Sequence, residues 1–277
     1  TRLPYRPMLA SGDFEMMEPL FHLYREALPL CEARARIYHG VRGAYFPETM
    51  TIFGTYSNGD YGWDRTGHEA KDVLCPWWQY AWNQGPELVA LMLDRYDYTR
   101  DGGFLREQVL PIARSVLDYF DTRFGRDEKG TLVISPTQAL ETHWHDVVDD
   151  APSVAGLHAV LARLRALPAG VPSAEDRTTW DRLADGLPPV PTADEEGTRF
   201  LSAAARFDPS YQNCETPELY AVFPFRLFGI GKDGIELARE AYARRKDHLD
   251  TGWPQDGEEA ALLGLTDEAR RRHHGLE

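Results

Sequence analysis

Hydrophobic residues recur every three or four positions along most of this chain. At residues 12–39 an apolar series follows the spacing of one face of an α-helix: Phe14, Met17, Phe21, Tyr24, Leu28 and Cys31. Pro19 and Pro29 mark points where this helix could kink or break. The same pattern predicts about eight helices, at residues 12–39, 77–98, 103–124, 154–167, 174–184, 218–228, 234–246 and a last segment ending near 272.

Polar segments of alternating length separate these helices. Residues 98–103 form a short turn that joins two helices as a hairpin, whereas residues 40–76 form a long connection rich in Gly, Tyr, Thr, Asn and Asp. Residues 207–218 form another polar loop, the longest strand expected is 132–134, and Ser153 is a candidate N-cap. Long loops loaded with Trp and acidic residues suit one mouth of an α/α toroid, because a solenoid would spread them. We therefore predict an all-α fold of toroid-like helical hairpins.

Composition favours one large domain spanning residues 1–277, since 43% of the 277 residues are hydrophobic. The net charge of −14, with no clustered Lys/Arg stripe, argues against a nucleic-acid partner. No apolar run is long enough to predict a membrane span, and three distant cysteines indicate no disulfide framework. The chain begins with neither Met nor a signal peptide, so we expect truncation at the N-terminus. The compartment stays open, with a secreted or periplasmic one favoured, and the oligomeric state is unknown.

The densest chemistry follows the short apolar segment 132–134, which Ser135 and Pro136 end. An acid, two imidazoles and an indole then crowd together with an aspartate: Glu141, His143, Trp144, His145 and Asp146. A carboxylic acid can protonate a glycosidic oxygen, while Trp offers an apolar surface with an N–H, and His can reach hydroxyl groups. This combination predicts an oligosaccharide or polysaccharide substrate. His143 and His145 could instead bind zinc or iron, but we expect hydrogen bonding to substrate, with no metal and no cofactor.

A hydrolase also needs a second carboxylate. Asp256, which follows Trp253 at a helix entrance, is the first choice, although a charge favoured by the helix dipole is an equal alternative for it. The second choice lies in the long loop, where acidic and aromatic residues gather that can equally bind sugar hydroxyls: Glu48, Asp60, Trp63 and Asp64. Asn213 and Glu215 occupy a loop that should face the same mouth and bind substrate. Glu218 is expected to act as a helix cap or dipole partner.

Several segments of the chain resemble the six-hairpin, or (α/α)6-toroid, glycosidases, most closely the glycoside hydrolase family 95 type of α-L-fucosidase and related bacterial proteins. The similar segments are 14–21 (FEMMEPLF), 39–46 (HGVRGAYF), 91–105 (LMLDRYDYTRDGGFL), 130–141 (GTLVISPTQALE) and 217–224 (PELYAVFP). The Ser-Pro…Glu element is the most specific of these. The resemblance implies that Glu141 is the general acid of a fucosidase-like glycoside hydrolase. We expect an inverting mechanism, but retention stays open because the sequence gives no distance between the two carboxylates.

The chain also departs from that family's pattern. In such fucosidases a pair of Asn residues orients the attacking water, and their segment would precede Thr1. A late Asp that completes the family's site has no clear match in this chain. A complete toroid also needs more helices than we predict, so either part of the toroid is missing or the ring is open. The alternatives are a phosphorylase, a polysaccharide lyase using Tyr56, Tyr61 or His145, or a catalytically silent carbohydrate-binding protein.

Overall fold

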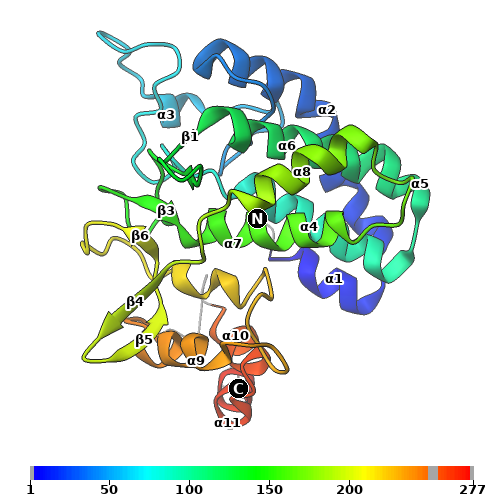
Figure 1. Ribbon diagram of the computed structural model, residues 1–277. Coiled ribbons are helices and arrows are strands. Elements are labelled where there is room, and N and C mark those ends of the chain that lie inside the picture. Colours follow the sequence, from blue (N-terminus) through cyan, green and yellow to red (C-terminus); the bar gives the residue numbers. More distant parts are fainter. Residues whose placement is uncertain (1–2, 249–254, 275–277) are drawn as a thin grey trace. The chain divides into compact units, whose positions relative to one another are not determined.

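The computed structural model describes residues 3–248 and 255–274, and these form two compact units. The first unit comprises the described residues of 1–75, 82–125 and 160–186, and the second those of 76–81, 126–159 and 187–277. Figure 1 shows that helices dominate and that the few strands are short.

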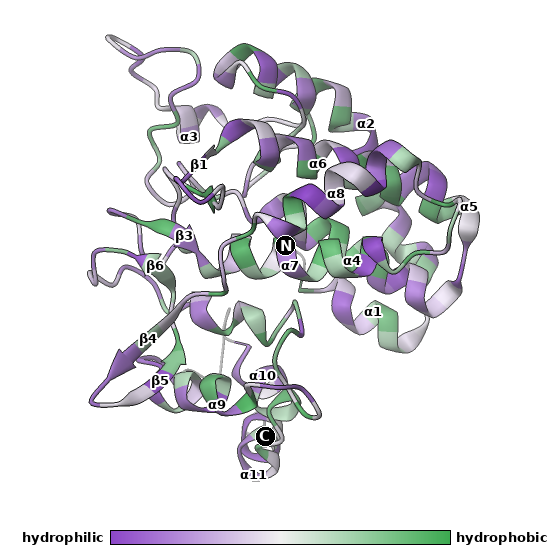
Figure 2. Ribbon diagram, in the orientation of Figure 1, coloured by the Kyte–Doolittle hydropathy of each residue, from purple (hydrophilic) through white to green (hydrophobic). Residues whose placement is uncertain are grey.

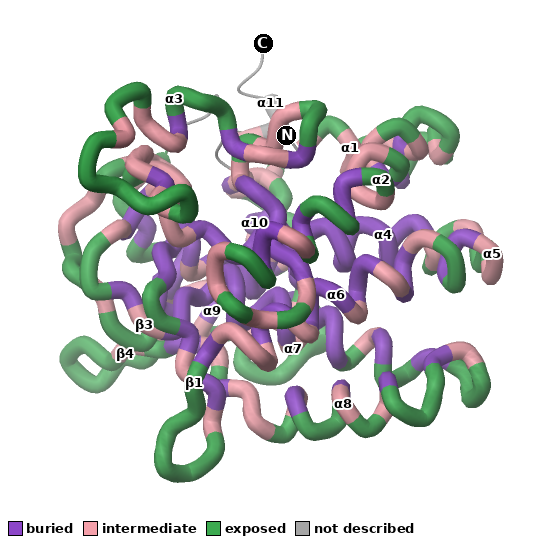
Figure 3. The backbone as a smooth tube through the Cα atoms, turned by 90° about the horizontal axis from the view of Figure 1, so that it is seen from above, coloured by how far each residue is buried: buried purple, intermediate pink, exposed green. Residues whose placement is uncertain are grey.

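Helices make up most of the first unit. They are α1 (Tyr5–Ser11), α2 (Phe14–His39), α3 (Asn58–Tyr61), α4 (Gln84–Thr99), α5 (Gly102–Phe104), a π-helical turn (Leu105–Val109), α6 (Leu110–Arg123), α8 (Ala174–Asp185) and the end of α7 (Ala151–Arg165). Figure 3 shows α4 as the most continuously buried of them, and every residue from Gln84 to Arg95 is buried. Its Asp94 carboxylate is balanced by Arg6 at 2.5 Å and Arg163 at 2.8 Å, which accounts for a charged group in this core.

Strand pairs and short helices make up the second unit. Strand β3 (Val148–Asp150) pairs antiparallel with β6 (Ala204–Arg206), and β4 (Thr192–Glu195) pairs antiparallel with β5 (Thr198–Leu201). Strand β2 (Leu132–Val133) pairs with β1 (Gly125–Arg126), whose residue Arg126 belongs to this unit. The remaining elements are the start of α7, a 3₁₀ turn (Pro217–Ala221), α9 (Ile235–Arg244), α10 (Asp256–Leu262) and α11 (Thr266–His274).

Most of the predicted helices are confirmed. The predicted 12–39 helix is α2, which passes through both Pro19 and Pro29 without ending. Figure 2 shows polar and apolar positions mixed along α2, and the residues it buries are the predicted stripe members Met17, Phe21, Leu28 and Cys31, with some neighbours. Helical periodicity was therefore a reliable guide where it persisted over several turns.

Two helix predictions were wrong in extent. The helix expected from residue 77 begins only at Gln84, because residues 76–80 form a turn held by side-chain bonds to Gln138. The helix expected at 218–228 is a single 3₁₀ turn, Pro217–Ala221, and residues 222–228 do not continue it. The last predicted helix is divided into α10 and α11 at Gly264, whose φ is +73°.

Ser153 is not the N-cap of α7. The Asp150 carboxylate accepts the Ser153 N–H at 2.8 Å and takes that place. The expectation that no strand exceeds 132–134 was also wrong, because β4 and β5 each have four residues. Their turn holds Glu196 at φ +52° and Gly197 at φ +81°, a pair of positive angles typical of tight hairpins.

Candidate functional site

The loop that carries Glu141 runs between β2 and β3 and is tied down at both ends. The Ile134 N–H donates to Asp149 Oδ1 at 2.7 Å, and the Thr137 hydroxyl donates to Asp150 Oδ2 at 2.6 Å. Burial raises the pKa of Asp150 to about 6, against the lowering effect of its hydrogen bonds from Thr137 and Ser153. The loop is thereby fastened to the first turn of α7.

A tight turn presents Glu141. Ala139 and His143 exchange two backbone hydrogen bonds, of 3.0 and 3.2 Å, and Leu140 adopts a left-handed φ of +53° between them. Such an angle costs a residue with a Cβ some strain and persists where surrounding contacts hold it. The turn places Glu141 at its tip, where the residue is half-buried.

The loop expected to face Glu141 does contact it. The Asn213 amide donates to Glu141 Oε2 at 2.7 Å, and the Glu141 N–H donates to Glu215 Oε2 at 3.3 Å. The Thr142 hydroxyl donates to the Glu215 carbonyl at 2.8 Å, so two loops distant in sequence form one polar cluster. The structure thus brings Glu141, Asn213 and Glu215 together, and their roles stay predictions.

The neighbouring aromatic residues differ in what they can do. The Trp144 indole N–H donates to the Glu141 carbonyl at 2.7 Å, and its ring meets Trp77 edge to face at 4.6 Å between centroids. His143 is buried, and its Nδ1 lies 2.9 Å from the Ser210 carbonyl, which can only accept, so we assign the proton to Nδ1. Burial lowers the pKa of His143, and the Ser210 bond opposes this. His143 thus holds the 207–218 loop, while His145 is exposed.

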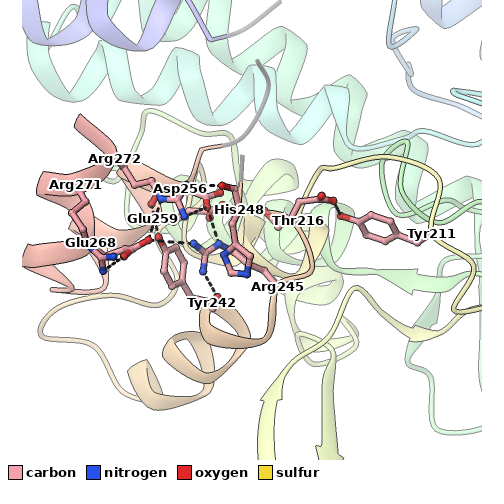
Figure 4. A network of polar contacts seen from close by, with 11 residues as sticks. Tyr211, Thr216, Tyr242, Arg245, His248, Asp256, Glu259, Glu268, Arg271 and Arg272 are labelled. Atoms are coloured by element: carbon pink, nitrogen blue, oxygen red, sulfur yellow. Dashed lines mark hydrogen bonds and ion pairs between the residues drawn. The ribbon is translucent and has the colours of Figure 1, made fainter. Parts of the chain in front are cut away.

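Asp256 lies in a buried ion-pair network. Its carboxylate accepts from Arg245 Nε at 2.8 Å and lies 3.6 Å from Arg272 Nη2, as Figure 4 shows. Asp256 is also the first residue of α10, so the geometry agrees with the alternative of a helix N-terminal charge. Trp253, its predicted companion, lies outside the described residues.

The second choice for the partner carboxylate was the group around Asp60 and Asp64, which belongs to the first unit. Asp60 is buried and forms a capping box with Ser57, whose N–H it accepts at 3.0 Å. Trp63 is 83% exposed, and Asp64 accepts the Thr66 N–H at 2.9 Å. Because Glu141 belongs to the second unit, a shared site stays a prediction.

Two acidic residues have a raised pKa that the sequence did not predict. Burial raises the pKa of Glu218 to about 7, partly opposed by the positive charge of Lys246. Burial, the Asp256 charge and the Glu218 charge raise the pKa of Glu259 well above its usual range. Glu259 accepts a bond of 3.4 Å from Thr216, which follows Glu215 in the same loop. Glu218 was expected to be a cap, and no pattern singled out Glu259, because burial is a tertiary property.

Within residues 3–248 and 255–274, no three His, Cys, Asp or Glu residues are arranged to hold a metal ion. Among those same residues, no helix combines the length and the apolar character that crossing a membrane requires.

Residues 5–162 match the glycosyl hydrolase family 95 catalytic domain, so the chain belongs to this family. Its structure is similar to that of a putative kojibiose phosphorylase from human microbiome, with a TM-score of 0.57 and 10% sequence identity. That likeness covers 91% of this chain but only 40% of the other, so this chain spans less than half of its length. No curated protein matches by sequence. Together these findings confirm the predicted family and the all-α, toroid-type fold class.

Proposed function

We propose that this chain is the catalytic region of an inverting glycoside hydrolase with Glu141 as general acid. Membership of the family supports glycosidase chemistry, and Glu141 closes the Ser-Pro…Glu segment. The observation that carries the assignment is the 2.7 Å hydrogen bond from Asn213 to Glu141 Oε2. It orients the carboxyl group at a turn tip beside Trp144, and a general acid must be held in position to protonate a leaving oxygen.

The substrate proposed is a neutral oligosaccharide with a terminal deoxy-sugar, as in an α-L-fucosidase. The test is proton NMR of 2′-fucosyllactose and neutral plant oligosaccharides with wild type and Glu141→Gln. Wild type should release a sugar whose first anomer is inverted, and the variant should lose about 10²- to 10⁴-fold in kcat because it cannot donate a proton. Retention in the first product would contradict inversion, and full activity of the variant would contradict the acid.

An activated substrate supplies the control for this variant. 4-Nitrophenyl glycosides have a leaving group that needs little protonation, so Glu141→Gln should lose far less activity on them than on oligosaccharides. Gln can still accept the hydrogen bond from Asn213, which keeps the loop contact. An equal loss on both substrates would indicate damage to the fold or to binding instead.

The base is proposed to be Asp256, with the Asp60 and Asp64 group as second choice. Asp256 is ion-paired with Arg245 and Arg272, so its variant needs a direct comparison with the others. Asp256→Asn, Asp60→Asn and Asp64→Asn should be assayed with sodium azide, which can replace the activated water. Recovery of turnover as a glycosyl azide identifies the base, and no recovery in any of them excludes all three.

Transfer to phosphate is the alternative raised by the putative kojibiose phosphorylase that shares the fold. A phosphorylase needs a cationic pocket for phosphate, whereas the groups that hydrogen-bond to Glu141, on Asn213, Glu215 and Trp144, are neutral or acidic. Lys246, a cation of the same unit, lies over the Tyr211 ring, 4.8 Å from its centroid. We expect inorganic phosphate to leave the rate unchanged and phosphorus NMR to show no sugar phosphate. A phosphate-dependent rate would select the phosphorylase.

A further inference from the structure

The Trp77 ring contacts Trp144, which is bonded to Glu141, and Trp77 has no role in the proposed acid-base chemistry. We propose that Trp77 and Trp144 together form a wall that binds the apolar face of a neutral sugar ring next to Glu141, and that Gln138 positions this wall. The inference rests on the proposed function for its substrate, and it adds the side chains that select an uncharged sugar.

The two indoles contact each other directly. Their centroids lie 4.6 Å apart with the planes at 77°, an edge-to-face arrangement. Both residues are half-buried, so neither is sealed completely within the interior. The Trp144 N–H donates to the Glu141 carbonyl, which ties this indole to the backbone of the proposed acid. Aromatic faces bind the C–H groups of sugar rings, while the neighbouring amide and carboxylates suit hydroxyl groups.

A buried amide joins the two parts of this wall. Gln138 is 1% exposed, and its Oε1 accepts the Tyr80 N–H at 2.8 Å. Its Nε2 donates to the Trp77 carbonyl at 2.5 Å and to the Leu140 carbonyl at 2.8 Å. One side chain therefore fixes the turn that carries Trp77 to the loop that carries Glu141. A buried amide bonded on both ends is costly to disturb, so this spacing is rigid.

The charges around the wall favour an uncharged ligand. Glu141 and Glu215 lie beside it, and Asp208 donates its N–H to the His145 carbonyl in the same cluster. A uronic acid placed against Trp144 would bring its carboxylate near these groups, and like charges repel in a partly desolvated site. The wall should therefore bind neutral sugars and discriminate against acidic ones.

The test measures binding apart from turnover. In a Glu141→Gln background, the Kd for 2′-fucosyllactose and a panel of neutral plant oligosaccharides is measured by saturation-transfer NMR and calorimetry. Trp77→Ala should weaken binding about tenfold, and Trp77→Phe less, because a smaller ring remains. Phe53→Ala, which removes a 75% exposed aromatic of the first unit, is the matched control and should leave Kd unchanged. Gln138→Leu, made in the protein that keeps Glu141, should raise KM with a smaller change in kcat.

The outcomes separate this inference from the proposed function. If wild type shows no turnover but Trp77→Ala weakens glycan binding about tenfold, the wall stands and the hydrolase is wrong. If wild type hydrolyses a glycan and Trp77→Ala leaves both Kd and KM unchanged, the wall is overturned while the hydrolase stands. Binding of no neutral glycan, or tighter binding of oligogalacturonates, also overturns the wall.

Discussion

At the scale of single residues, buried polar groups organise the candidate site. Asp150 is fully buried between the Thr137 hydroxyl and the first turn of α7, and Gln138 is almost as buried. Neither residue type predicts burial by itself, because Asp and Gln are usually exposed. Glu141 could be singled out because His143, Trp144 and His145 follow it closely in the sequence. The residues that hold its loop could be identified only from their contacts in the structure.

The raised pKa of Asp150 predicts a pH-dependent stability. Its folded pKa of about 6 exceeds the unfolded value of about 3.8, so the folded state binds the proton more tightly. The stabilisation of the folded state by this tighter proton binding is complete below about pH 4 and is lost as the pH rises through about 6. Relative to wild type, Asp150→Asn should therefore gain about 3 kcal/mol in the free energy of unfolding across that interval. Urea denaturation of both proteins over a pH series measures this, and a constant difference would contradict it.

At the scale of elements, the helices follow the hydrophobic pattern and the turns follow side-chain contacts. The stripe in α2 continued through two prolines, yet residues 76–80 left the helical pattern because Gln138 holds their backbone. The 40–46 connection is similarly determined by packing, since Gly43 lies against α6 and the Ala44 N–H donates to the Ser115 carbonyl at 2.8 Å.

Gly43→Ala should destabilise the protein strongly. A Cβ at this position would overlap the Tyr119 nitrogen and the Ser115 oxygen, both backbone atoms of α6 that cannot move aside, and φ is +85°. We expect a loss of about 4 kcal/mol or more. Gly40 provides the control, because its φ is +70° and nothing lies within 4 Å of an added Cβ, so Gly40→Ala should cost only about 1–2 kcal/mol. Equal losses in urea denaturation would refute the close approach.

At the scale of the whole molecule, charge restricts the substrates. The net charge of −14 repels anionic ligands over the range set by salt screening, and a neutral glycan is not affected. We expect kcat/KM on a neutral oligosaccharide to be the same at low and high salt, and any binding of oligogalacturonates to increase with salt. A neutral substrate whose turnover falls steeply with salt would contradict this.

The sequence by itself determined the helical class and the family, and it pointed to the loop proposed to carry the acid, because helical periodicity and a dense local motif are properties of neighbouring residues. The tertiary structure alone decided which residues surround Glu141. Asn213 and Glu215 hydrogen-bond to Glu141 although more than seventy positions separate them from it in the sequence. The Trp77 ring contacts Trp144, and Gln138 binds the backbone of both segments. Asp256 is paired with two arginines. Burial, ion pairing and protonation depend on contacts between chain segments that are distant in sequence. Local sequence patterns do not specify which of these segments will be in contact.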